Sequence, residues 1–164
     1  MGQEIEYRYL LKSLPPTGAV KPHAIAQGYL STDPDRIVRV RVKGDQGFLT
    51  IKGRKIDAVS PEFEYEIPVD EAQSLLTLCG QNVLTKDRYA LVGPDGMIWD
   101  VDIFTGRHAG LMIAEIELAI IDDQYMIPSW VDGADITGDS RLGNAALAQI
   151  GDDALRALLA EYAA

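Results

Sequence analysis

The sequence has few of the residues that build disulfides, metal clusters or membrane spans. Its 164 residues include one cysteine and two histidines, which excludes an intramolecular disulfide and any cluster of several cysteine ligands. No segment approaches the ~20 consecutive apolar residues that a membrane-spanning helix needs. The opening MGQEIEYRYLLK lacks the apolar core of a signal peptide. We therefore expect a cytoplasmic protein that has no membrane partner.

Basic residues are also in the minority. The chain has 15 Lys and Arg against 25 Asp and Glu, which gives a net charge of −10. This balance argues against nucleic acid as a partner. Any anion site must be local, with cations gathered against the overall negative charge. The length and the hydrophobic share of 47% are typical of one globular domain, which we expect to span residues 1–164.

What the chain does have is a series of segments in which charged and apolar residues alternate. Residues i and i+2 of a strand share a face, so each segment presents mostly one sign of charge to one side and apolar residues to the other. The pairs are Glu4/Glu6 (followed by Arg8), Arg39/Arg41, Lys52/Arg54, Glu64/Glu66, Lys86/Arg88, Asp100/Asp102 and Glu115/Glu117.

This alternation predicts a fold of the α+β class that is mainly antiparallel β. Glycine-containing turns at 44–47 and 93–96 are typical of hairpins. The helical signals predict a few flanking helices, two of them C-terminal, and the apolar face of the last is expected to pack internally or to form a homodimer contact. The predicted helices are 70–79, 144–148 and 152–162, and the predicted strands are 3–11, 24–30, 36–43, 47–54, 61–69, 83–92, 97–105 and 111–119.

The charged faces have a simple explanation and a functional one. A polar strand face usually points to water. Here, however, the faces are almost purely ionic, the pairs share a sign, and the helices are too few to cover the apolar faces of eight strands. Eight strands can close into a barrel, so we expect the ionic residues to line a hydrated lumen. Arginine and lysine suit phosphate, and paired carboxylates suit Mg²⁺ or Mn²⁺.

The ordered motifs resemble those of the CYTH superfamily, also called triphosphate tunnel metalloenzymes. Residues 4–8 (EIEYR) are similar to the family signature Glu-x-Glu-x-Lys, with Arg8 in the place of the lysine. The resemblance implies an eight-stranded closed β tunnel with a charged interior that binds triphosphate and a divalent metal. Further motifs follow in the family's order at 27–30, 38–41, 50–52, 64–67, 86–89, 102–104, 114–117 and 137–144.

The resemblance also implies roles for individual residues. Arg54, Glu66 and Asp100 share the inward parity, and a place at the rim or in an ion pair stays open for them. Glu64 is a possible further acid. The implied catalytic residues are Glu4, Glu6, Arg8 and Glu117. The implied metal ligands are Glu4, Glu6, Asp102, Glu115 and Glu117, and the implied phosphate-binding residues are Arg8, Arg39, Arg41, Lys52, Lys86, Arg88 and Arg141.

The predicted function is the hydrolysis of inorganic triphosphate with Mg²⁺ or Mn²⁺ as cofactor. A triphosphate-containing small molecule is the expected partner. Two alternatives stay open: cyclisation of ATP or hydrolysis of thiamine or nucleoside triphosphates by the same site, and a polyphosphate-binding module without catalysis. Besides Arg8, the chain departs from the family pattern at Leu142, where tyrosine is often expected, and at Ser140, where some members carry lysine.

Overall fold

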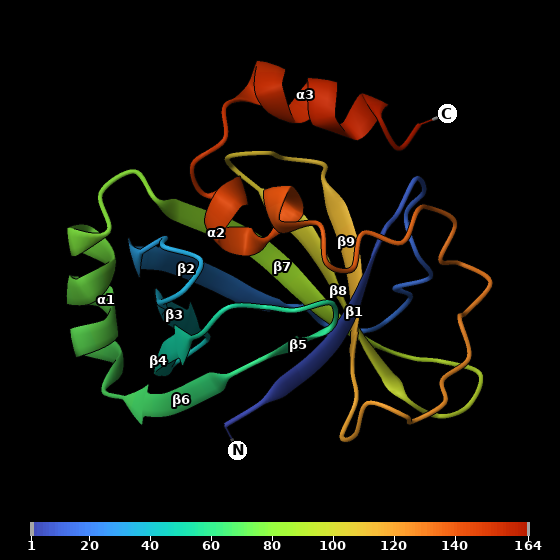
Figure 1. Ribbon diagram of the computed structural model, residues 1–164, viewed down its shortest axis with the longest axis horizontal. Coiled ribbons are helices and arrows are strands. Elements are labelled where there is room, and N and C mark those ends of the chain that lie inside the picture. The colour runs from blue at the N-terminus through green and yellow to red at the C-terminus, as the bar shows by residue number, and fades with distance from the viewer. Residues whose placement is uncertain (1, 164) are drawn as a thin grey trace.

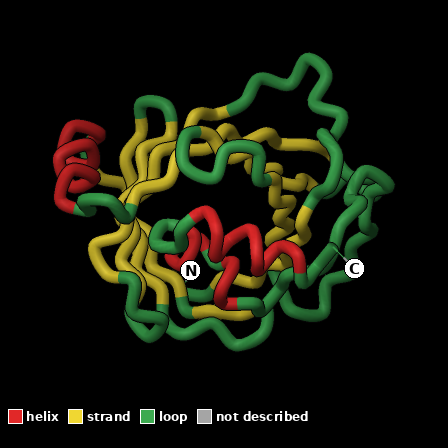
Figure 2. The backbone as a smooth tube through the Cα atoms, turned by 90° about the horizontal axis from the view of Figure 1, so that it is seen from above, coloured by secondary structure: helices red, strands yellow, loops and turns green. Residues whose placement is uncertain are grey.

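The strands form one antiparallel sheet of nine strands that curls into a nearly closed barrel (Figures 1 and 2). The computed structural model describes residues 2–163. The predicted mainly antiparallel barrel is confirmed, and every predicted strand is present. The strands are β1 (Glu4–Leu10), β2 (His23–Ser31), β3 (Ile37–Lys43), β4 (Gln46–Lys52), β5 (Val59–Ser60), β6 (Glu62–Ile67), β7 (Val83–Val92), β8 (Ile98–Thr105) and β9 (Met112–Glu117), in the order β5-β1-β9-β8-β7-β2-β3-β4-β6.

The barrel closes through a single extended segment that Pro61 divides. Proline lacks the N–H group that a strand ladder needs, so the segment is split into β5 and β6. β5 pairs with β1, whereas β6 pairs with β4 at the opposite edge of the sheet. The nine strands therefore correspond to the eight predicted ones, with the strand predicted at 61–69 beginning two residues earlier and interrupted at Pro61.

The C-terminal part of the chain completes the barrel wall beside β1. The backbone N–H of Leu10 donates to the carbonyl of Ala134, and that of Ile136 donates to the carbonyl of Arg8, both at 2.9 Å. Tyr9 and Asp135 form an antiparallel bridge between these two hydrogen bonds. Because β5 pairs only with the first residues of β1, residues 134–136 form the hydrogen bonds along the rest of that edge of β1.

The helices lie on the outside and across one end of the barrel. α1 (Val69–Leu78) packs on the outer face of β2, β3 and β4, while η1 (Ser140–Leu142), α2 (Asn144–Leu147) and α3 (Asp152–Ala160) gather at one end (Figures 1 and 2). Gly28 allows α1 to come close, because a Cβ there would lie 2.7 Å from Cys79 Sγ. The three predicted helices are confirmed. No helix within residues 2–163 combines the length and apolar character needed to cross a bilayer.

Two apolar cores stabilise the barrel. The second corrects the expectation that charged residues line the whole lumen. The first includes Trp99 and Ile116 on the outer face, and Trp130 from the following loop packs against it. The second lies inside the barrel at the end that the C-terminal helices cover. It shows that the lumen is not ionic along its whole length, because one end is plugged by Leu10, Tyr29, Leu84, Phe104 and Ile113 from the strands and by Leu142, Ala145 and Leu147 from the C-terminal segment.

Candidate active site

The register of the strands turns the charged residues into the barrel. Directly opposed residues of neighbouring strands point to the same side. Arg8 opposes Glu115, and Arg88 opposes Asp102. The inward orientation is confirmed by this register for Glu4, Glu6, Arg8, Arg39, Arg41, Lys52, Glu64, Lys86, Arg88, Asp100, Asp102, Glu115 and Glu117.

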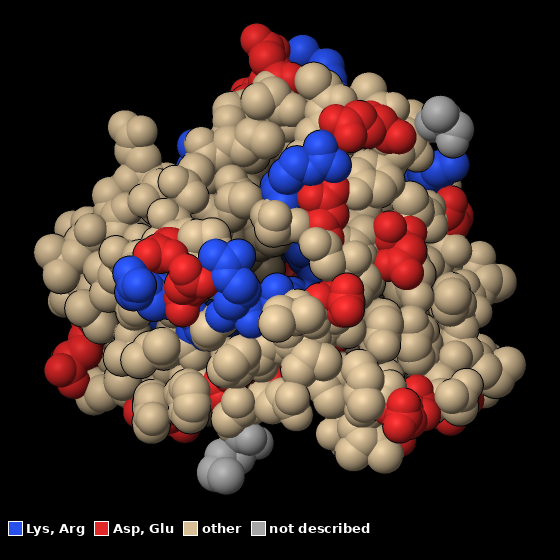
Figure 3. Space-filling model, viewed as in Figure 1, with Lys and Arg blue, Asp and Glu red and all other residues tan. Residues whose placement is uncertain are grey.

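A cavity of about 350 Å³ lies between this charged wall and the C-terminal segment. Figure 3 shows basic side chains gathered around a hollow in the middle of one face. The C-terminal segment forms the other side of the cavity with residues 138–140, 143–146 and 149. The cavity is therefore bounded by cations and acids together. Its charged lining comprises Glu4, Glu6, Arg8, Arg39, Lys52, Arg54 and Lys55 from the barrel, and Asp139 from the C-terminal segment.

Ion pairs connect the cations of the cavity to its acids. Lys52 Nζ lies 2.9 Å from Glu4 Oε1. On the neighbouring strands, Glu64 Oε2 lies 3.3 Å from Arg39 Nη2 and 3.4 Å from Arg41 Nη2. The opposing charges therefore lie close enough to compensate one another, which is how the barrel tolerates so many ionised groups.

A second group of charges is packed more deeply and does not line the cavity. Lys86 Nζ lies 2.6 Å from Asp102 Oδ2, and each side chain is only 1% exposed. Arg88 donates to both oxygens of Asp102, at 2.7 and 2.8 Å, and to Glu115 at 3.0 Å. Burial alone would raise the pKa of Asp102, but the two neighbouring cations outweigh it and hold that pKa below its ordinary value. This cluster fixes the back of the charged wall.

Three buried guanidinium nitrogens at the charged wall have no hydrogen-bond partner in the described part of the chain. They are Arg8 Nη2, Arg39 Nε and Arg41 Nε. A buried donor without a partner costs about 1–3 kcal/mol, and more when it is charged. An anion with several oxygens bound in the cavity would supply the missing acceptors for donors that face it. Because guanidinium groups match phosphate oxygens in geometry, this arrangement favours a phosphate compound.

The acidic side of the cavity is crowded. Burial raises the pKa of Glu6 to about 7, and the charges of Glu115 and Glu4 add to the effect. Partial burial, with the charges of Glu4 and Glu6, also raises the pKa of Glu117. Carboxylate oxygens are the ligands that Mg²⁺ and Mn²⁺ prefer, and a cation here would relieve the repulsion. The donor set thus fits a divalent metal.

The carboxylates are not already arranged around a common point. Among residues 2–163, no three His, Cys, Asp or Glu side chains lie close enough together to hold a metal ion. The reason is that several of these acids are each turned toward a cation: Glu4 faces Lys52, and Glu115 faces Arg8 and Arg88. Metal binding at this wall requires the acids to exchange these partners for the ion.

The raised pKa of Glu6 predicts how the stability of the metal-free protein depends on pH. Its pKa is about 7 in the fold against 4.5 in the unfolded chain, so the folded state binds more protons between these values. The contribution of Glu6 to stability should therefore be greatest below pH 4.5, decrease as the pH rises toward 7, and stay reduced above 7, by up to about 3 kcal/mol. Urea unfolding of wild-type and Glu6→Gln protein from pH 5 to 8 checks this.

Glu6→Gln should remove the part of the pH slope that Glu6 causes and stabilise the metal-free protein at pH 8. Glu71→Gln on α1 is the matched control, because Glu71 is exposed on the outside of the barrel. It should keep the wild-type slope. Equal slopes in all three proteins would show that Glu6 is ionised without penalty.

Three predicted phosphate ligands, Arg41, Lys86 and Arg88, point into the barrel but do not line the cavity. A fourth, Arg141, is turned away from the cavity. Its guanidinium lies 2.8 Å from Asp139 Oδ2 and 3.1 Å from Glu161 Oε1, and the side chain is about half exposed. These two carboxylates hold it outward, on η1. Arg54 lies at the rim of the cavity and pairs with the exposed Asp35. A place at the rim or in an ion pair was the alternative that the sequence analysis left open for Arg54.

Two neighbours of the charged groups were missed by the sequence analysis. Lys55 lines the cavity, and its Nζ is 3.8 Å from Glu6 Oε1. It follows β4 in a loop, where alternation gives no signal. Thr50 is fully buried, accepts a hydrogen bond from Arg39 and donates one to Glu64. Thr50 lies two residues before Lys52 on the same strand, so the alternation predicts that both side chains point into the barrel.

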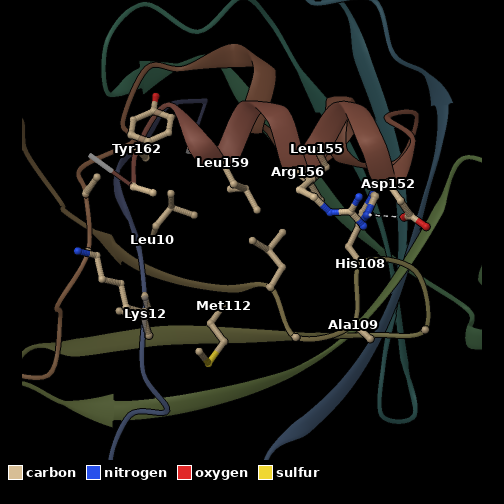
Figure 4. Close-up of a pocket in the computed structure, with 17 residues that line it drawn as sticks. Leu10, Lys12, His108, Ala109, Met112, Asp152, Leu155, Arg156, Leu159 and Tyr162 are labelled. Carbon is tan, nitrogen blue, oxygen red and sulfur yellow. Dashed lines mark ion pairs between the residues drawn. The ribbon is translucent and has the colours of Figure 1, made fainter.

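A larger cavity, about 820 Å³, lies beneath α3 (Figure 4). Its walls are mainly apolar, and Leu10 of β1 lies in the same apolar core as Leu155 of α3, with Leu159 packed against that core. It lacks the dense mixture of cations and carboxylates found in the smaller cavity. Size alone therefore does not mark the active site, and the smaller charged cavity is the candidate.

Comparison with known proteins identifies the family of this chain. A family model described as the CYTH domain matches residues 2–140. The chain belongs to the CYTH family. This CYTH domain is 41% identical to an inorganic triphosphatase of Acetivibrio thermocellus over 90% of the chain and 94% of that relative.

Two further similarities concern inorganic triphosphatases. One from Nitrosomonas europaea is 32% identical, over 88% of this chain and 96% of that protein. The crystal structure of an inorganic triphosphatase matches the fold with a TM-score of 0.65 at 31% identity, covering 90% of this chain and 98% of the other. The predicted family and fold are thus both confirmed.

Proposed function

We propose that this CYTH domain hydrolyses inorganic triphosphate in the cavity between the charged wall and the C-terminal segment. The observation that carries the proposal is the set of buried guanidinium nitrogens that have no partner within residues 2–163, in the same barrel as a crowded group of carboxylates. The names of the relatives at 41% and 32% identity support the same reaction. We further propose a cytoplasmic location and a single-domain organisation, as the sequence predicts.

The cations of the cavity would bind and align the substrate. Arg8, Arg39 and Lys52 line the cavity directly, so they are placed to bind phosphate oxygens. Arg41, Lys86 and Arg88 do not line the cavity, and they would attract the substrate by adding positive charge to the wall around it. Arg141 would join only after releasing Asp139 and Glu161. Holding three linked phosphates in one orientation supplies much of the catalysis in phosphoryl transfer.

The acids would hold the metal on which triphosphatases of this family generally depend. We propose Mg²⁺ or Mn²⁺, bound by Glu4, Glu6 and Glu117, with Glu115 and Asp102 behind them. When bound, such an ion polarises phosphoryl oxygens and lowers the pKa of a coordinated water. The chain's own part is to release these carboxylates from their cations, and Glu64 keeps Arg39 and Arg41 oriented.

Phosphate release from several substrates tests the reaction. Purified protein should release phosphate from tripolyphosphate with Mg²⁺ or Mn²⁺ and lose this activity with a chelator. ATP and thiamine triphosphate are the comparison substrates. Pyrophosphate released from ATP would instead select the cyclase alternative. Tight binding of tripolyphosphate without turnover at any metal concentration would select the binding module.

Glu117→Ala should reduce metal-dependent turnover by about 100-fold or more, because a lost ligand weakens the metal and its alignment with phosphate. The measurement is the initial rate over a range of Mn²⁺ concentrations. Glu71→Ala on the outer helix is the control and should retain the wild-type rate. A wild-type rate in Glu117→Ala at limiting metal would remove Glu117 from the metal site.

A further inference from the structure

Arg8, the residue that departs from the family signature, uses two of its three guanidinium nitrogens in hydrogen bonds and leaves the third without one among the described residues. Its Nε donates to Glu115 Oε2 at 2.9 Å, and its Nη1 donates to the carbonyl of Leu142 at 2.8 Å. Its Nη2 is buried and has no partner among the described residues. The side chain is 5% exposed, so these contacts are made inside the barrel. One guanidinium thus joins β9 to η1.

The backbone of Arg8 contacts the same C-terminal segment. Its N–H donates to Thr137 Oγ1 at 2.9 Å, and its carbonyl accepts from the N–H of Ile136. Beyond these contacts, residues 138–140 and 143–146 line the cavity. The position of the segment therefore sets the shape of the cavity on the side opposite the charged wall.

We propose that Arg8 is a positioning residue for the C-terminal segment, residues 137–148, as well as a phosphate contact. Nε and Nη1 hold the segment to the acidic wall, which leaves Nη2 as the donor for a phosphate oxygen. A lysine at this position carries one nitrogen on a flexible chain and lacks the rigid planar fork. The part concerning phosphate rests on the proposed function, whereas the part concerning the segment does not.

Amide hydrogen exchange of the protein without metal or substrate tests the positioning role. The reporters are the N–H groups of Leu142, Leu147 and Ala148, which are hydrogen-bonded within the segment. In Arg8→Lys they should exchange about tenfold faster or more, because a hydrogen bond from a charged donor is lost. Amides of β3 should keep their wild-type exchange rates, which distinguishes local loosening from general destabilisation.

Arg88→Lys is the matched control, since Arg88 also binds Glu115, but its ion-pair partners among the described residues all lie on β8 and β9. It should leave exchange at Leu142, Leu147 and Ala148 unchanged. Unchanged exchange in Arg8→Lys, or equal acceleration in both variants, would overturn the proposal. Because neither metal nor triphosphate is present, this result is independent of whether the protein hydrolyses triphosphate.

A measurement on the wild-type protein covers the case in which Arg8→Lys does not fold. In ¹⁵N-labelled protein, the Nη1 and Nη2 groups of Arg8 should give separate NMR signals, because two fixed hydrogen bonds restrict rotation of the guanidinium. Adding tripolyphosphate should shift the Nη2 signal and leave Nη1 bonded to Leu142. A single averaged signal for both groups would contradict the tether, and a shift confined to Nη1 would contradict the division of roles.

Discussion

Asp102→Asn is expected to lower the free energy of unfolding by about 3–5 kcal/mol, because it leaves a buried cation without its counter-charge. The carboxylate of Asp102 contacts Lys86 Nζ at 2.6 Å and Arg88 through two hydrogen bonds, and the Lys86 side chain is 1% exposed. For a chain of this length the melting temperature should fall by roughly 6–20 °C. Urea and thermal unfolding at pH 7 measure the change.

Asp100→Asn provides the control on the same strand and the same face. Its carboxylate lies 3.5 Å from Arg88 Nη1 and the side chain is 44% exposed, so the loss should stay below about 1 kcal/mol. If both variants lose the same stability, burial of the Lys86–Asp102 pair is not what stabilises the barrel.

Arg39→Ala is expected to lower kcat/KM for tripolyphosphate by about 100-fold or more. Arg39 lines the cavity, is 8% exposed and has a buried Nε without a partner in the described part of the chain. If Arg39 binds phosphate as proposed, the substitution deletes two or more charge-assisted hydrogen bonds, each worth about 1.5–3 kcal/mol. Initial rates over a range of tripolyphosphate concentrations, with metal held constant, give the ratio.

Arg36→Ala is the matched control for the loss of one positive charge. Arg36 lies just before β3, its side chain is 72% exposed, and it pairs with Asp33 one turn away. Its replacement should change kcat/KM by less than about threefold, as expected for a solvent-screened charge. Similar losses in the two variants would mean that overall charge, rather than contact by Arg39, attracts the substrate.

Alternation was enough to predict the strands and the inward face. The i and i+2 rule placed residues such as Arg39, Asp102 and Glu115 correctly because strand side chains alternate strictly between faces. The boundary at Pro61 was missed because Val59 and Ser60 are too short a segment to show a pattern. The pairing of residues 134–136 with β1 was missed for the same reason.

The same i and i+2 rule also predicts the apolar residues inside the barrel, but the sequence analysis did not apply it to them. Leu10 lies two residues after Arg8, and Leu84 lies two residues before Lys86. Antiparallel neighbours bring the end of one strand beside the start of the next, so these apolar residues share one end of the lumen. The outward turn of Arg141 had no such signal, since it depends on Asp139 and Glu161 meeting through the tertiary fold.

The partners of β1 lie far from it in the sequence, and this has a consequence for how the chain folds during synthesis. β1 pairs with β5, with β9 and with residues 134–136. Its pairing with β9 and with residues 134–136 therefore forms only after more than 100 further residues have been made. Contacts so distant in sequence slow folding, and an unpaired edge strand is a template for association with other chains. We expect the nascent chain to depend on rapid completion of its last third to avoid aggregation.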